Sequence, residues 1–297
     1  MLETVLASIP HTIAAAVTNA AALHGRMIDE IRLYRNAQAA VVIAGKNVTL
    51  PIVCDGQMMD ETVCRLCGES LYAHADTIRN GYIFTPAGFR VGVSGRAICD
   101  HESVERVTDI TSLCIRVPYR FPGCADDLFC LATEGGVPHS MLIWSPPGVG
   151  KTTALRELAY KLAASPVPYR TAVIDSRYEL VWENSVAYMD IFRGYPRARG
   201  MEIAVRTMNP QFVLCDEIAN EMDAEAVLQC AASGAAVIAS AHGASVEDLQ
   251  RQSAIRCLLD NGVFQFLIGL SRQDGRVIPY SHCHSKELCK HRSSVIC

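Results

Sequence analysis

The stretch of sequence that decides the fold is residues 141–163, MLIWSPPGVGKTTALRELAYKLA. Its first four residues are apolar and predict a short buried strand. A loop of serine, proline and glycine follows and ends in Gly150-Lys151-Thr152-Thr153, after which leucines recur at helical spacing. A strand, a glycine-rich loop and a helix in this order predict a phosphate-binding P-loop.

The residue types of this loop suit the phosphates of a nucleotide. Gly148 and Gly150 leave the backbone bare, so that its N–H groups can surround negative charge. Lys151 supplies a charge to the β- and γ-phosphates at the start of the helix, and Thr152 supplies a hydroxyl to Mg²⁺. Ser145 stands where the usual pattern has its first glycine, which restricts the backbone there. The predicted nucleotide-binding residues are Ser145, Pro146, Pro147, Gly148, Val149, Gly150, Lys151, Thr152 and Thr153.

Composition limits the class of protein. At 297 residues the chain is long enough for two domains, and 50% hydrophobic with 20% charged residues is ordinary for a globular protein. A net charge of −4 argues against broad electrostatic binding to nucleic acid. The start, MLETVL, lacks a basic segment typical of a secretory signal, so we expect the 13 scattered cysteines to be reduced in a cytosol. The uncharged run 4–25 contains too many polar residues to predict a membrane span.

Two domains are expected, divided near residue 137 where prolines and glycines gather. Residues 1–137 predict a smaller α+β domain, with a helix ending near Gly25, antiparallel strands over 28–53, a helix over 62–75 and a hairpin over 81–93. Residues 138–297 predict an α/β domain with a parallel sheet, because strands and helices alternate. Its strands are expected at 141–144, 171–175, 212–215, 235–240, 264–270 and 277–280.

Acidic residues follow two of these strands. Asp216 and Glu217 come directly after an apolar strand downstream of the P-loop, in the position of a Walker B pair. An aspartate there can hold Mg²⁺, and the neighbouring glutamate can orient or deprotonate an attacking water. Asp175, Arg177 and Glu179 follow the strand after the P-loop helix and predict a second charged group at the same edge, with its carboxylates placed to help position water or metal. The alternatives are an acidic surface turn for the first pair and a solvated loop with a local ion pair for the second.

Histidine and arginine complete the predicted site. His242 ends the strand after Glu217 and can sense a γ-phosphate through a hydrogen bond, although a structural histidine is the alternative. An arginine can stabilise phosphate charge from its own or a neighbouring subunit, and Arg206 is the first candidate. The other candidates, of which most are expected to be ordinary surface arginines, are Arg193, Arg197 and Arg199.

A zinc site is disfavoured. Cys64 and Cys67 form one C-x-x-C, but a second such pair is absent from the sequence. The possible partners lie in the other predicted domain, at His282, Cys283, His284, Cys289 and His291.

With these motifs in place, the chain resembles the stage III sporulation protein AA family, which is related to type II and type IV secretion ATPases. The resemblance covers nearly the whole chain. The matching residues are Asp29-Glu30-Ile31-Arg32, Arg79-Asn80-Gly81-Tyr82-Ile83, Phe89-Arg90-Val91-Gly92, Ser112-Leu113, Ile115-Arg116, Gly123-Cys124-Ala125, the P-loop, Asp175 to Leu180, Gly200-Met201 with Arg206, Asp216-Glu217-Ile218 and Ala241-His242-Gly243.

The resemblance implies a RecA-like ATPase that binds ATP and Mg²⁺ between the subunits of a hexameric ring. It implies a cytoplasmic location in the mother cell, peripherally at the membrane, where a small membrane protein partner joins the ring to the channel into the forespore. By this likeness Glu217 prepares water, and Glu179 and His242 correspond to the acidic and histidine boxes of secretion ATPases. One departure is Ser176, which stands where the family usually has a glutamate.

Two alternative functions stay open at this point. The first is a P-loop ATPase that acts on nucleic acid, which the negative net charge and the absence of an Arg-x-x-x-His spacing in the tail disfavour. The second is a nucleotide-gated scaffold that binds ATP without hydrolysing it.

Overall fold

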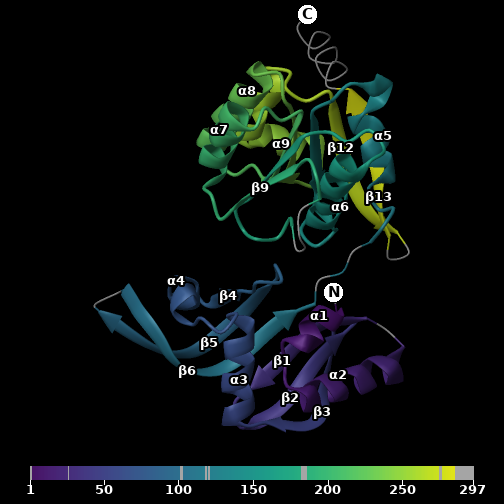
Figure 1. Ribbon diagram of the computed structural model, residues 1–297. Coiled ribbons are helices and arrows are strands. Elements are labelled where there is room, and N and C mark those ends of the chain that lie inside the picture. The colour runs from purple at the N-terminus through teal and green to yellow at the C-terminus, as the bar shows by residue number, and fades with distance from the viewer. Residues whose placement is uncertain are drawn as a thin grey trace, which may run out of the picture. The chain divides into compact units, whose positions relative to one another are not determined.

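The computed structural model describes residues 2–25, 27–100, 103–117, 119, 121–181, 186–273 and 276–284 (Figure 1). The chain divides into two compact units, Met1–Tyr119 and Arg120–Cys297. Each unit has a β-sheet and a hydrophobic core of its own, so each is described separately.

The division falls before the position near residue 137 that the sequence suggests. The reason is α5 (Asp126–Ala132), a short helix that the sequence pattern did not reveal. Its residues Leu128 and Ala132, and Ala125 just before it, are buried in the same cluster as Leu155 of α6 (Lys151–Ala164). The segment between the two positions therefore belongs to the second unit.

The N-terminal unit begins with two helices and continues as an antiparallel sheet. Pro10 separates α1 (Leu2–Ala7) from α2 (His11–His24), and α2 ends at Gly25, whose φ of 57° lets its N–H bond to the Ala21 carbonyl oxygen. The sheet has the strand order β3-β2-β1-β6-β5-β4. The elements after α2 are β1 (Ile28–Tyr34), β2 (Ala37–Ile43), β3 (Lys46–Cys54), α3 (Gly56–Leu66), η1 (Tyr72–His74), α4 (Ala75–Arg79), β4 (Tyr82–Phe84), β5 (Arg90–Asp100) and β6 (Ser103–Arg116).

The expected strands over 28–53 and the hairpin over 81–93 are present, while the helix expected over 62–75 lies earlier. Asp55 caps α3, because its carboxylate accepts a hydrogen bond from the Met58 N–H at 2.8 Å. Beyond Cys67 the chain turns through Gly68 with a φ of 57°. α3 therefore ends at Leu66, within the first half of the helix that the sequence pattern predicts.

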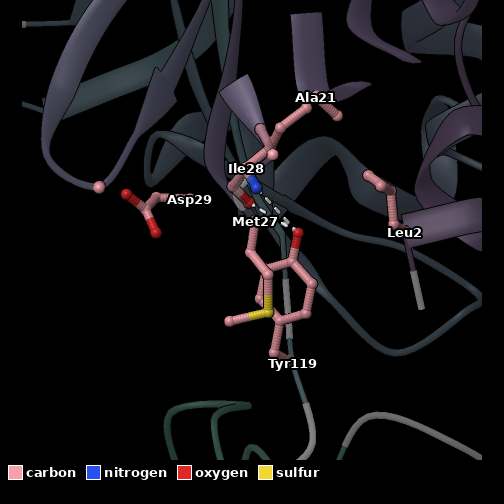
Figure 2. A pocket seen from close by; sticks show the side chains of 8 residues that line it. Leu2, Ala21, Met27, Ile28, Asp29 and Tyr119 are labelled. Atoms are coloured by element: carbon pink, nitrogen blue, oxygen red, sulfur yellow. Dashed lines mark hydrogen bonds between the residues drawn. The ribbon is translucent and has the colours of Figure 1, made fainter. Parts of the chain in front are cut away.

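Tyr119 closes the N-terminal unit beside an open cavity of about 660 Å³ (Figure 2). Its hydroxyl donates to the Ile28 carbonyl oxygen at 3.0 Å and accepts from the Ile28 N–H at 3.1 Å. The other lining residues are mostly apolar, and Asp29 is the charged one among them. The cavity lies within this unit and includes none of the predicted site residues.

The second unit is built on a sheet of order β13-β12-β7-β11-β10-β8-β9. Neighbouring strands from β12 to β9 run parallel, and β13 pairs with β12 antiparallel. The strands are β7 (Met141–Ser145), β8 (Thr171–Asp175), β9 (Met189–Arg193), β10 (Phe212–Glu217), β11 (Ala236–His242), β12 (Phe266–Gln273) and β13 (Arg276–His284).

Helices cover both faces of this sheet, which explains why its strands read as continuous apolar runs. Ile143, Leu214 and Ile238 are buried in one cluster with α5 and α6. Leu142 and Val213 are buried in a different cluster, with four other helices. Figure 1 shows helices on the side of the sheet away from α5 and α6. Those helices are α7 (Arg197–Thr207), α8 (Glu221–Ala232), α9 (Val246–Arg251) and α10 (Ser253–Asp260).

A buried ion pair joins α7 to α8. Arg197 Nη1 lies 2.6 Å from Asp223 Oδ2, and the two side chains are 8% and 5% exposed. The same carboxylate oxygen accepts a hydrogen bond from the Ala219 N–H at 3.0 Å. Because Ala219 follows β10 after one residue, the pair also fixes the chain as it leaves that strand.

We predict that Asp223→Ala destabilises the second unit by about 3–5 kcal/mol, because it leaves the Arg197 charge buried without its partner. Both tryptophans of the chain, at 144 and 182, lie in this unit, so their fluorescence during urea unfolding reports on it. The control is Glu202→Ala, which removes the shared partner of exposed Arg199 and Arg206 on α7 and should change stability far less. Equal losses in the two variants would contradict the role given to the buried pair.

Candidate phosphate-binding site

The loop between β7 and α6 has the backbone that an anion cradle requires. Gly148 and Gly150 have φ values of 77° and 125°, in the region that favours glycine. A Cβ placed on Gly148 would meet open space, so it is the backbone angle that requires glycine there. Ser145 ends β7 without a left-handed φ, so serine fits the position where the usual pattern has glycine.

The side chain of Lys151 is buried beneath this loop. Its Nζ lies within hydrogen-bond distance of the Ser145 carbonyl oxygen at 2.9 Å, of Ser145 Oγ at 3.2 Å and of the Pro146 carbonyl oxygen at 3.3 Å. Burial lowers the pKa of Lys151, while the charges of Glu217 and Asp216 act to raise it. The ammonium group is thus held at the loop by oxygen atoms and by two nearby carboxylates.

The start of α6 adds backbone donors and two hydroxyls. The first hydrogen bond of the helix runs from the Ala154 N–H to the Gly150 carbonyl oxygen at 2.9 Å. The amide groups of the preceding turn have no partner inside the helix, which makes this end attractive to an anion. Thr152 and Thr153 lie half-buried in that turn. The assignment of Thr152 to Mg²⁺ stays a prediction.

Asp216 lies buried at the end of β10, next to β11. Ser240 of β11 donates its hydroxyl to Asp216 Oδ1 at 3.4 Å. Sequence reasoning missed Ser240, although a serine inside the apolar strand Ala236–His242 was a visible signal. The buried hydroxyl of Ser240 is thus a partner for one oxygen of the Asp216 carboxylate.

His242 joins the phosphate loop to the acidic pair. Its Nδ1 lies 3.0 Å from Lys151 Nζ, and its Nε2 lies 3.6 Å from Glu217 Oε2. The same Glu217 oxygen is 3.5 Å from Arg177 Nη1. The structure therefore brings Lys151, Glu217 and His242 into one cluster, as their positions at neighbouring strand ends predict.

Asp175 shapes the loop that follows β8, and its predicted part in positioning water or metal stays a prediction. Its side chain is buried and accepts hydrogen bonds from the N–H groups of Glu179 at 2.7 Å and Val181 at 3.1 Å. Burial raises the pKa of Asp175, and these backbone donors lower it. The carboxylate thus acts as a substitute for backbone acceptors within the loop.

Arg156 of α6 fixes the same loop from the other side. Its Nε donates to the Glu179 carbonyl oxygen at 3.1 Å, and its Nη2 donates to the same atom. Burial lowers the pKa of Arg156 to about 9, and the charges of Asp175 and Glu179 partly offset this. Arg156 is a second residue that sequence reasoning missed, although its charge on a leucine-rich helix was an available signal.

The candidate arginines separate into different environments. Arg197 is taken up by the buried ion pair with Asp223, so it is a structural residue. Arg206 and Arg199 are exposed on α7, and both pair with Glu202. Arg193 donates to the Val181 carbonyl oxygen at 3.2 Å. Arg206 therefore lies apart from the Lys151 cluster within one chain, on the sheet face opposite α6.

The structure describes only part of the chain that bears on a zinc site or a membrane span. Among the side chains that the structure describes, no three or more His, Cys, Asp and Glu gather as a metal site. The side chains of His282, Cys283 and His284, and the residues Cys289 and His291, lie outside that set. Cys67 is buried, and burial raises the pKa of its thiol to about 11. Searched over the described ranges, the helices include none with the length and apolar character to cross a bilayer.

Solved structures share this architecture. The ATPase DotB of Legionella pneumophila superimposes with a TM-score of 0.64 at 15% identity, covering 96% of this chain and 83% of that one. The pilus retraction motor PilT with bound ADP gives 0.64 at 16% identity, covering 94% and 88%. At these identities the likeness establishes the fold, which confirms the predicted RecA-like P-loop domain with a smaller α+β unit before it.

The comparison of sequences identifies a narrower group of relatives than the comparison of folds. Stage III sporulation protein AA of Bacillus subtilis (strain 168) is 29% identical over 258 residues, which is 84% of each chain. Protein SEEDLING PLASTID DEVELOPMENT 1 of Arabidopsis thaliana is 28% identical over 166 residues, which is 52% of this chain and 23% of that protein. The family model described as Sporulation stage III, protein AA matches residues 7–280. On this match, and in agreement with the motifs, the chain belongs to the sporulation stage III protein AA family.

Proposed function

We propose that this protein hydrolyses ATP and uses the energy as a secretion-type motor in sporulation. One observation carries the enzymatic part: one edge of the parallel sheet gathers a buried lysine, an aspartate, a glutamate and a histidine beside a glycine loop. Lys151, His242 and Glu217 form a continuous series of contacts, and Asp216 lies close enough to influence the pKa of Lys151. A triphosphate needs positive charge, backbone donors, a metal ligand and a base in one place.

The residues present fit a nucleotide and Mg²⁺. The open side of Gly148 leaves room above the loop, and the first turn of α6 supplies backbone donors. Thr152 and Asp216 would hold Mg²⁺, which neutralises phosphate charge when bound. Lys151 would bind the β- and γ-phosphates and exchange its contacts to Ser145 and Pro146 for phosphate oxygens.

Glu217 is the best candidate for the group that prepares water. Its side chain is 25% exposed, so water can reach it, and His242 lies beside the same carboxylate oxygen. Glu179 would act beside it, from the loop that Arg156 and Asp175 hold. A carboxylate that accepts the proton of an attacking water lowers the barrier by general-base catalysis.

The cellular part of the proposal rests on the family and the fold. Stage III sporulation protein AA is named for sporulation, and PilT is named as a pilus retraction motor. We place this protein at the mother-cell side of the channel to the forespore, as a hexameric ring that meets the membrane through a small membrane protein. Arg206, exposed on α7, would complete the site of a neighbouring subunit in such a ring.

Lys151→Ala should weaken ATP binding by about 10- to 100-fold, because it removes charge-assisted hydrogen bonds to phosphate. The measurement is calorimetric titration with ATP and Mg²⁺. Lys161→Ala is the matched control, since Lys161 lies about 15 Å away along the same helix and pairs with Asp126. An ATP affinity that survives Lys151→Ala unchanged would remove the assigned site.

Glu217→Gln should lower kcat by about 10²- to 10⁴-fold without weakening ATP binding, because the amide cannot accept the proton of water. Phosphate release and ATP titration on the same preparation measure the two quantities. Glu221→Gln, an exposed position in the first turn of α8, should behave as wild type. If the wild type binds ATP without turnover, the nucleotide-gated scaffold replaces the enzyme. Turnover that rises steeply with added DNA would favour the nucleic-acid motor instead.

Light scattering with size-exclusion chromatography tests the ring. We expect ATP to shift Glu217→Gln protein, which cannot consume the ligand, toward a mass of six chains of 32.4 kDa. ADP should favour this form less, because it lacks the γ-phosphate that an arginine of the neighbouring subunit would contact. A monomer with full ATPase activity in the same fractions would exclude the ring.

A further inference from the structure

Four charged or polar side chains form a line across the candidate site. Lys151 Nζ lies 3.0 Å from His242 Nδ1, His242 Nε2 lies 3.6 Å from Glu217 Oε2, and that oxygen lies 3.5 Å from Arg177 Nη1. The line begins at the residue that would bind phosphate and ends at an arginine to which the P-loop and Walker B patterns assign no role. Glu217, the proposed base, therefore has a cationic partner as well as a histidine.

The first contact decides where the proton of His242 lies. A lysine ammonium group has donors but no acceptor, so Nδ1 must accept the hydrogen bond from Lys151. In a neutral imidazole the hydrogen then resides on Nε2, which faces Glu217. In this arrangement Glu217 faces His242 Nε2 on one side and the Arg177 guanidinium on the other.

The Arg177 contact is suited to exchange. Its side chain is 52% exposed, and the ion pair with Glu217 is long at 3.5 Å, so solvent screens it. The backbone on both sides of Arg177 is fixed, because the preceding Asp175 accepts from the N–H groups of Glu179 and Val181. Arg156 further holds the Glu179 carbonyl oxygen. A loose guanidinium on a fixed loop can change partners without the loop moving.

A γ-phosphate is a stronger partner than Glu217. It carries more negative charge than one carboxylate, and its oxygens match the two parallel donors of a guanidinium. We propose that Arg177 is a positioning residue that holds Glu217 in the nucleotide-free site and transfers to the γ-phosphate when ATP binds, which releases Glu217 to act on water. ADP cannot cause this transfer, because it lacks the γ-phosphate. The inference rests on the proposed function, and it adds the means by which the base responds to ATP and not to ADP.

The test compares affinities for ADP and for a non-hydrolysable ATP analogue, AMP-PNP, in the full chain with Mg²⁺. Arg177→Gln should weaken AMP-PNP binding about tenfold and ADP binding much less, since a single charge-assisted contact to the γ-phosphate is lost. Arg177→Lys should recover part of the difference. Arg170→Gln is the matched control, because Arg170 precedes β8 and Arg177 follows it, so the two lie at opposite ends of one strand.

A double-mutant cycle adds a readout that a merely structural arginine would not move. Glu217→Gln removes the competitor for Arg177, so AMP-PNP should bind more tightly, and this gain should shrink in Arg177→Gln/Glu217→Gln. Gains of equal size with and without Arg177 would overturn the proposal, as would equal loss of ADP and AMP-PNP binding in Arg177→Gln.

Measurement of ATP turnover distinguishes a failure of this inference from a failure of the proposed function. Arg177→Gln should lower kcat about tenfold or more, whereas Arg170→Gln keeps the wild-type value. If wild type binds AMP-PNP but shows no turnover, the ATPase proposal fails while the affinity comparison still decides the role of Arg177. If Arg177→Gln turns over at the wild-type rate, the transfer is excluded and the ATPase proposal stands. If wild type binds neither nucleotide, both fall.

Discussion

The candidate site of the second unit is built around one buried charge, the ammonium group of Lys151. A lysine is rarely tolerated at 7% exposure unless oxygen atoms or opposite charges surround it. Here the carbonyl oxygens of Ser145 and Pro146 accept its hydrogen bonds, and Asp216 and Glu217 oppose the loss of charge that burial favours. Such a site is ready to exchange neutral oxygens for charged ones.

The strand register turns this local arrangement into a shared site. β7 and β11 are aligned so that Ser145 lies beside His242, and β11 and β10 so that Ser240 lies beside Glu217. Parallel strands end at the same edge of a sheet, so residues almost 100 positions apart become neighbours without a specific loop between them. Helices on both faces hold that edge, and their packing explains why the strands are apolar throughout. The cluster is therefore a consequence of topology as much as of the individual side chains.

The sequence predicts most of this arrangement, and the misses have physical causes. The P-loop, the strand before Asp216 and the strand ending at His242 could be identified because their patterns are local. The strand β9 contains Asp190 and Arg193 among its five residues, so its apolar character is too weak to recognise. The roles of Asp175 and Arg156 depend on where one loop folds back, which spacing alone does not reveal. The same holds for α5, whose burial depends on α6.

The arginines of α7 and the arginine in the loop after β8 have different partners. α7 carries Arg197, Arg199 and Arg206, but the first is buried against Asp223 and the other two pair with Glu202 on the helix surface. Each arginine on α7 is thus paired with a carboxylate of its own unit. Arg177 differs because its loop begins at the carboxyl end of β8, beside β10, and so reaches Glu217 of its own chain. A cation beside the proposed base thus lies in cis, and any cation supplied by a neighbour would act in addition to it.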